Sequence, residues 1–182
     1  MAASKLQRLF GRSRFKRDQR GAVAIEFAFL AIPFFLIIGA ILETALMFLC
    51  SQIFDSAVQD ASRLIRTGQA NAAQFTVSSF RDQVCDGTYG LFGDCSGIFI
   101  DVETIDKFSV AVIEPPIDRD CTENCRWTRE SVYSPGGASE KLLVQAYYKW
   151  PTTLDFFGFS VANLADGTRL MSSAAVFRNE PF

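Results

Sequence analysis

The sequence predicts an α+β protein, in which a long N-terminal membrane-spanning helix continues into an amphipathic spine and leads to a small domain. The domain is expected to hold one further helix and an antiparallel sheet of about four strands. Two observations carry this prediction. Residues 22–50 form an apolar run in which only Glu26 and Glu43 are charged. After residue 97, apolar and polar side chains alternate over short stretches, which is the pattern of half-buried strands.

The apolar run of residues 22–50 is long enough to cross a membrane. As a helix it extends for about 43 Å at ~1.5 Å per residue, against roughly 30 Å of hydrocarbon. A cleaved secretory signal is the alternative, but the apolar core of a signal peptide is only roughly 7–15 residues long. The run therefore predicts a helix that stays in the membrane.

Basic residues are concentrated before the apolar run. Of the 18 Lys and Arg residues, seven lie in residues 1–21 together with one of the 20 acidic residues. The rest of the chain therefore holds 11 basic and 19 acidic residues, a net charge near −8. Basic flanks stay on the cytoplasmic side of a membrane helix. We expect a basic cytoplasmic leader at residues 1–21, a transmembrane helix at 22–50 and an extracytoplasmic α+β domain at 51–182.

Two helices are expected on the outer side. The first continues the membrane helix to about Thr67, because apolar residues recur at helical spacing after residue 50, and Gly68 is a typical helix stop. The second is expected to begin at Asn71, with Gln74 completing a capping box, and to end near residues 85–87. Its apolar stripe consists of Ala73, Val77, Phe80 and Val84.

Strand character dominates the rest of the domain. Four stretches have the composition and alternation of strands, namely residues 98–103, 108–112, 142–149 and 170–177. Pro115 and Pro116 end the second of these stretches, because proline has no N–H to donate to a sheet. The alternation of Asp101 and Glu103 with apolar neighbours predicts that both carboxylates lie on a solvated face.

The five cysteines predict disulfides outside the cytoplasm. Cys85 and Cys95 lie close together in the sequence, as do Cys121 and Cys125, while Cys50 is left over at the end of the apolar run. Two disulfides in an oxidising compartment are favoured over zinc, because the spacings are C-x9-C and C-x3-C and the chain has no histidine. Three pairings of the four cysteines are possible; the short loops favour Cys85–Cys95 and Cys121–Cys125, with Cys50 free.

No residue pattern points to catalysis. Without histidine, nucleophile systems of the Ser–His or Cys–His kind are excluded, and no Gly-rich phosphate loop or metalloprotease motif is present. A metal site at Asp101, Glu103 and Asp106 is less favoured than a solvated strand face, and the aromatic run 147–150 is best explained as a packed strand. We expect no catalytic residue, no metal, no cofactor and no nucleic-acid partner.

The two carboxylates in the apolar run are the candidate functional residues. An ionisable residue inside hydrocarbon is expensive and is by default a functional hypothesis. Glu26 lies near the start of the helix, where the positive end of the helix dipole lowers this cost. A carboxylate held at the inner interface without a further role is the alternative. Glu43 lies toward the outer half of the membrane, where a helix–helix contact is the role expected.

The start of the run resembles the processing site of type IV prepilins. A basic leader closed by Gly21, an immediate apolar run and a glutamate at the fifth position, Glu26, make up this site, which reads RGAVAIEFA over residues 20–28. The chain is most similar to the TadE-like proteins of tight-adherence (Tad) pilus assembly. The similarity extends to SPG at 134–136, AYYKWP at 146–151 and AVFRNEPF at 175–182.

The resemblance implies a function and a set of partners. It implies a minor pseudopilin of the bacterial inner membrane, cut between Gly21 and Ala22 by a prepilin peptidase, with a periplasmic domain and with other pseudopilins and the Tad pilus machinery as partners. It also implies that Glu26 meets the new amine of a neighbouring subunit during assembly. Phe27 replaces the tyrosine of the major pilins, which are also far shorter, and this favours a minor component. A membrane-anchored interaction domain with no pilus role is the alternative.

Overall fold

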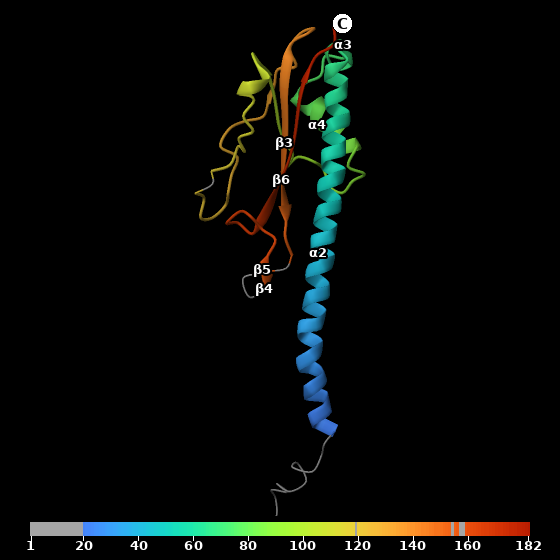
Figure 1. Ribbon diagram of the computed structural model, residues 1–182, viewed down its shortest axis with the longest axis vertical. Coiled ribbons are helices and arrows are strands. Elements are labelled where there is room, and N and C mark those ends of the chain that lie inside the picture. Colours follow the sequence, from blue (N-terminus) through green and yellow to red (C-terminus); the bar gives the residue numbers. More distant parts are fainter. Residues whose placement is uncertain (1–19, 119, 154, 157–158) are drawn as a thin grey trace, which may run out of the picture. The chain divides into compact units, whose positions relative to one another are not determined.

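The computed structural model describes residues 20–118, 120–153, 155–156 and 159–182 (Figure 1). The chain divides into two units, one ending at Leu42 and the other comprising Glu43–Phe182. The expected cytoplasmic leader at residues 1–21 lies outside the described residues except for its last two positions. Within the second unit the architecture is α+β, as the sequence predicts.

Helix α2 runs from Arg20 to Arg66 and is the longest element of the chain. The sequence predicted its end correctly, because Gly68 follows it in the left-handed conformation with φ of 76°. A side chain at this position would be both strained and crowded, since an added Cβ would lie 2.5 Å from Cγ of Phe182. Arg66, in the last turn, carries a charge that the negative end of the helix dipole favours.

The second predicted helix begins later than expected. A four-residue helix, α3 (Gln69–Ala72), comes first, and the main helix α4 runs from Val77 to Asp86. The predicted cap at Asn71 is wrong. Thr76 caps α4 instead, because its hydroxyl oxygen accepts a hydrogen bond from the backbone N–H of Ser79.

The main sheet has four strands in the order β2-β1-β3-β6. It is mixed rather than wholly antiparallel, because β1 pairs in parallel with the two-residue strand β2, whereas the β1–β3 and β3–β6 pairs are antiparallel. The second pair is the longest, with eleven residues on each strand. A separate pair joins β4 to β5. The bounds are β1 (Phe99–Ile105), β2 (Val132–Tyr133), β3 (Lys141–Pro151), β4 (Asp155–Phe156), β5 (Phe159–Ser160) and β6 (Thr168–Arg178).

The strand predicted at residues 108–112 is absent from the sheet. The segment instead begins with the 3₁₀ helix η2 (Phe108–Val110), and its apolar side chains are exposed. Neither Val112 nor Ile113 has a backbone hydrogen bond to any described residue. Alternation alone was misleading here, because β1 takes its partners from residues more than 25 positions further along the chain.

The hydrophobic core lies between α2, α4 and one face of the sheet. From Met47 onward α2 turns one side toward this core, and β1, β3 and β6 contribute every second residue. The two layers are seen side by side in Figure 1. The fully buried side chains of the core include Phe54, Val58, Ile65, Phe80, Val84, Ile100, Val102, Leu142 and Val144.

The opposite face of the sheet is covered by a segment that comprises residues 115–118 and 120–131. Trp127 packs on Phe99 of β1, with ring centroids 5.1 Å apart, and Lys149 of β3 donates to the carbonyl of Cys125. The prediction that Asp101 lies on a solvated face is therefore wrong. Its side chain is fully buried and pairs with the guanidinium of Arg129 from the covering segment. Glu103, nearer the end of β1, is exposed as expected.

Two disulfides close short loops at separate places in the domain. Cys85, at the end of α4, is bonded to Cys95, and Cys121 is bonded to Cys125 within the covering segment. Both are the local pairings that the short loops favoured. Cys50 is free and is buried in the core against the sheet.

Candidate membrane anchor and processing site

The part of α2 that precedes the second unit (Glu43–Phe182, called the compact unit below) is apolar on all sides and exposed along its length. Val23, Phe27 and Phe29 expose 65%, 71% and 75% of their surface, and the same holds for nearly every large side chain up to Leu42. Soluble proteins do not leave an apolar surface of this size in water. Within the described residues, α2 from Gly21 onward is also the one helix long and apolar enough to cross a membrane. This surface is therefore a candidate membrane anchor.

Gly21, Ala22 and Glu26 lie on the first turns of this exposed helix. All three residues are exposed, and Glu26 has no hydrogen-bond or ion-pair partner among the described residues. A Cβ added at Gly21 would meet no atom of the described residues within 4 Å. Ala22 and Glu26 are separated by about 6 Å along the helix axis at ~1.5 Å per residue. The described fold thus leaves the Glu26 carboxylate without a partner, and no packing contact requires glycine at position 21.

Glu43 occupies a different environment from Glu26. It is half-buried, it is the first residue of the compact unit, and its Oε1 accepts a hydrogen bond from the backbone N–H of Thr153. Sequence reasoning expected Glu43 to contact another helix and missed Thr153 altogether. The donor is a backbone group in the stretch after β3, and no side-chain pattern identifies such a donor.

Elsewhere in the domain, the aromatic residues considered for ligand binding and the acidic residues considered for metal binding do not form such sites. Tyr147, in the aromatic run 147–150, is fully buried and donates its hydroxyl hydrogen to Oε1 of Gln145. Burial raises the pKa of Tyr147 and of Tyr133 to about 12. In the part of the chain that the structure describes, no group of three acidic or cysteine side chains is arranged to hold a metal ion. Asp101, Glu103 and Asp106, for which a metal site was the less favoured interpretation, do not form such a group.

The comparison with known protein families matches the anchor and its extension into the domain. Residues 21–63 match the family model described as TadE-like protein, which bears out the resemblance read from the sequence. The match begins at Gly21, contains Glu26 and Glu43, and covers 43 of the 182 residues. No curated protein and no solved structure matches the chain.

Proposed function

We propose that this chain, with a TadE-like segment at residues 21–63, is a minor pseudopilin-like component of Tad (Flp) type IV pilus assembly. It is anchored in the bacterial inner membrane by α2 and carries a periplasmic domain that contributes to pilus biogenesis and adherence. Its partners are the prepilin peptidase, other pseudopilins and the Tad pilus machinery. The proposed role is one of assembly and not of catalysis.

The topology follows from charge. Seven basic residues precede the apolar helix, whereas the chain beyond it is acidic. Basic segments next to a membrane helix stay in the cytoplasm. The domain that begins at Glu43 then lies in the periplasm, an oxidising compartment in which the disulfides Cys85–Cys95 and Cys121–Cys125 persist.

One observation carries the processing step, namely the contrast between Gly21 and Gly68. The fold requires glycine at Gly68, where φ is positive and Phe182 leaves no room for a Cβ. At Gly21 no described residue fills that space. The described fold therefore gives no packing reason for glycine at position 21, and in our proposal its role is recognition by a peptidase that cuts between Gly21 and Ala22.

Glu26 has a role that depends on this cleavage. Removal of the leader leaves a positively charged amine on Ala22, and an ammonium group in hydrocarbon needs a counter-charge. The Glu26 carboxylate of a neighbouring subunit supplies this charge in our proposal. The exposed position of Glu26 on α2 supports this role, because its carboxylate is not consumed by a contact within the described chain.

The processing step is tested by the mass of the mature protein. The full chain is produced with a Tad prepilin peptidase, extracted from membranes and measured by intact mass spectrometry. We expect a chain that begins at Ala22. Gly21→Val should block cleavage, whereas Gly39→Val, a matched change in the same helix, should leave it intact. Recovery of only the full-length chain from the wild type would contradict the pseudopilin role and favour a plain membrane-anchored interaction domain.

The topology is tested separately. A reporter that is active only in the periplasm is fused after Phe182, and a reporter that is active only in the cytoplasm is fused at the same place in a second strain. We expect activity from the first fusion alone. The reverse result would place the domain in the cytoplasm and contradict the proposed function as a whole.

A further inference from the structure

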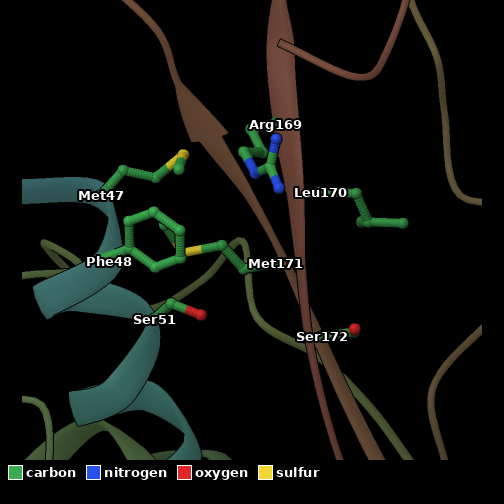
Figure 2. A pocket seen from close by; sticks show the side chains of 7 residues that line it. All are labelled: Met47, Phe48, Ser51, Arg169, Leu170, Met171 and Ser172. Atoms are coloured by element: carbon green, nitrogen blue, oxygen red, sulfur yellow. The ribbon is translucent and has the colours of Figure 1, made fainter. Parts of the chain in front are cut away.

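A groove lies between α2 and β6, one to two helical turns after the start of the compact unit. It has a volume of about 160 Å³ and is lined by Met47, Phe48 and Ser51 of α2 and by residues 169–172 of β6. Figure 2 shows that Leu170 and Ser172 point to the other side of the strand. Because side chains alternate along a strand, Arg169 and Met171 are the strand residues that face α2.

The lining of the groove combines apolar side chains with a single cation. Met47 and Met171 are buried at its base, Phe48 exposes 59% of its surface at its rim, and Arg169 provides the only charge. One guanidinium N–H, at Nη1, donates to the carbonyl of Val161. Within the described part of the chain, no carboxylate lies at ion-pair distance from Arg169. An uncompensated guanidinium beside apolar side chains is suited to an anion that carries an apolar tail.

The position of the groove along α2 matches the depth of lipid headgroups. Residues 22–42 of this helix extend about 31 Å at ~1.5 Å per residue, which is the thickness of the hydrocarbon core. The backbone of Met47 and Phe48 comes about 8–9 Å further along, at the outer edge of a headgroup layer that is roughly 5–8 Å thick, and helical side chains lean back toward the N-terminus and so into this layer. Leu46, Phe48 and Leu49 are still exposed there, so the helix remains apolar on its outer side at this level.

We propose that this groove binds an anionic phospholipid of the outer leaflet, with its phosphate on Arg169 and its glycerol backbone against Phe48. The Ser51 hydroxyl at the groove supplies a further hydrogen-bond donor. The proposal rests on the membrane anchoring in the proposed function. The domain is acidic, and its net negative charge would repel an anionic surface. Arg169 would give it one specific contact with an anionic lipid.

The test measures lipid preference with the full chain. The protein is extracted in a zwitterionic detergent, and phosphatidylglycerol and phosphatidylcholine are titrated separately while bound lipid is counted by native mass spectrometry. A single arginine near an anionic surface is expected to favour phosphatidylglycerol about fivefold. Arg169→Gln should abolish this preference. Arg178→Gln is the matched control, because Arg178 is also on β6 and also donates to a backbone carbonyl, that of Ser139.

The outcomes separate the possible errors. The lipid site would be overturned if Arg169→Gln still prefers phosphatidylglycerol, or if the wild type shows no such preference. The wild-type measurement needs no variant, so the test does not depend on whether Arg169→Gln folds. Displacement of phosphatidylglycerol by millimolar glycerol 3-phosphate would indicate a small-anion site and overturn the commitment to a lipid. Phe48→Ala should weaken both lipids and keep their ratio. If the wild type is absent from the membrane fraction, the proposed anchoring fails, whereas a membrane-bound protein without lipid preference contradicts only this inference.

Discussion

The carboxylate of Glu43 and the backbone N–H of Thr153 are hydrogen-bonded across 110 positions of the sequence. Glu43 is the first residue of the compact unit, and Thr153 lies two residues beyond the end of β3. The bond therefore fastens α2, at a position within the apolar run, to the chain that follows the longest strand pair. It gives one of the two acidic residues in the apolar run a structural role, in contrast to Glu26.

Replacement of Glu43 should destabilise the domain without removing the protein from the membrane. We expect Glu43→Ala to lower the free energy of unfolding by about 2 kcal/mol, because a hydrogen bond to a charged group contributes roughly 1.5–3 kcal/mol. Glu43→Gln keeps an acceptor oxygen and should lose about half as much. Chemical denaturation of the detergent-solubilised protein provides the measurement. Glu26→Gln is the control and should leave the unfolding midpoint unchanged; equal effects of the two changes would contradict the assignment.

Loss of Arg129 should be among the most damaging changes in the domain. Its partner Asp101 is fully buried, and Asp101 Oδ1 has no hydrogen-bond partner among the described groups. Arg129→Ala leaves an uncompensated buried charge, for which the expected loss is about 3 kcal/mol. Arg126→Ala, an exposed change in the same covering segment, should alter the unfolding free energy by less than about 0.5 kcal/mol. A small effect of Arg129→Ala would mean that water reaches Asp101.

Alkaline pH should destabilise the domain between pH 10 and 12. Burial raises the pKa of both Tyr133 and Tyr147 to about 12, against 10 in the unfolded chain. Below pH 10 both states hold these protons, so stability does not change. Above it the unfolded chain releases them first, and the free energy of unfolding falls by up to about 1.4 kcal/mol per pH unit for each tyrosine. Denaturant midpoints measured across this range check the slope.

Tyr133→Phe supplies the matched variant for this prediction. The buried hydroxyl of Tyr133 has no hydrogen-bond partner among the described groups, so its removal should be neutral or stabilising at pH 7. The same change should reduce the alkaline slope, because Tyr133 is one of three tyrosines, with Tyr147 and Tyr148, whose pKa is raised by burial. An unchanged slope would show that other groups cause the alkaline unfolding.

The two disulfides should contribute unequally. They close loops with sequence separations of 10 and 4, for which the chain-entropy relation gives about 2.7 and 1.9 kcal/mol. The paired changes Cys85→Ala with Cys95→Ala should therefore lower stability more than Cys121→Ala with Cys125→Ala. Alkylation of the native, unreduced protein should leave Cys50 unlabelled, because it is buried in the core. Peptide mapping that finds a bridge to Cys50 would contradict the assignment.

The elements that the sequence predicts well are those whose structure depends on residues close to one another in the sequence. The long helix, its stop at Gly68, and the strands around residues 142–149 and 170–177 all follow from periodicity and from glycine geometry. The local cysteine pairings follow from short loops. The apolar surface around Glu26 is equally local, because a helix that is apolar all round has no other stable environment than lipid or other helices.

The predictions that failed depend on contacts between distant residues. Asp101 is buried because the covering segment folds back over the sheet and brings Arg129 to it, 28 positions away. The strand at residues 108–112 has the right alternation, yet β1 pairs with β3 instead, with Phe99 opposite Tyr147. Thr76 caps α4 in place of Asn71, which lies within α3 and whose side chain donates to the carbonyl of Gly136. Periodicity contains no information on any of these partners.

The exposed segment of residues 108–113 has a consequence for the behaviour of the protein in concentrated solution. Phe108, Val110, Val112 and Ile113 each expose more than half of their surface, and the segment carries no charge. Uncharged, strand-prone stretches of this length nucleate intermolecular β-aggregates when they are accessible. Glu114 and the prolines Pro115 and Pro116 follow directly and act as gatekeepers, since a charge and two residues without N–H groups stop a growing sheet. Colloidal stability of the domain therefore depends on Glu114, Pro115 and Pro116, of which only Pro116 is buried.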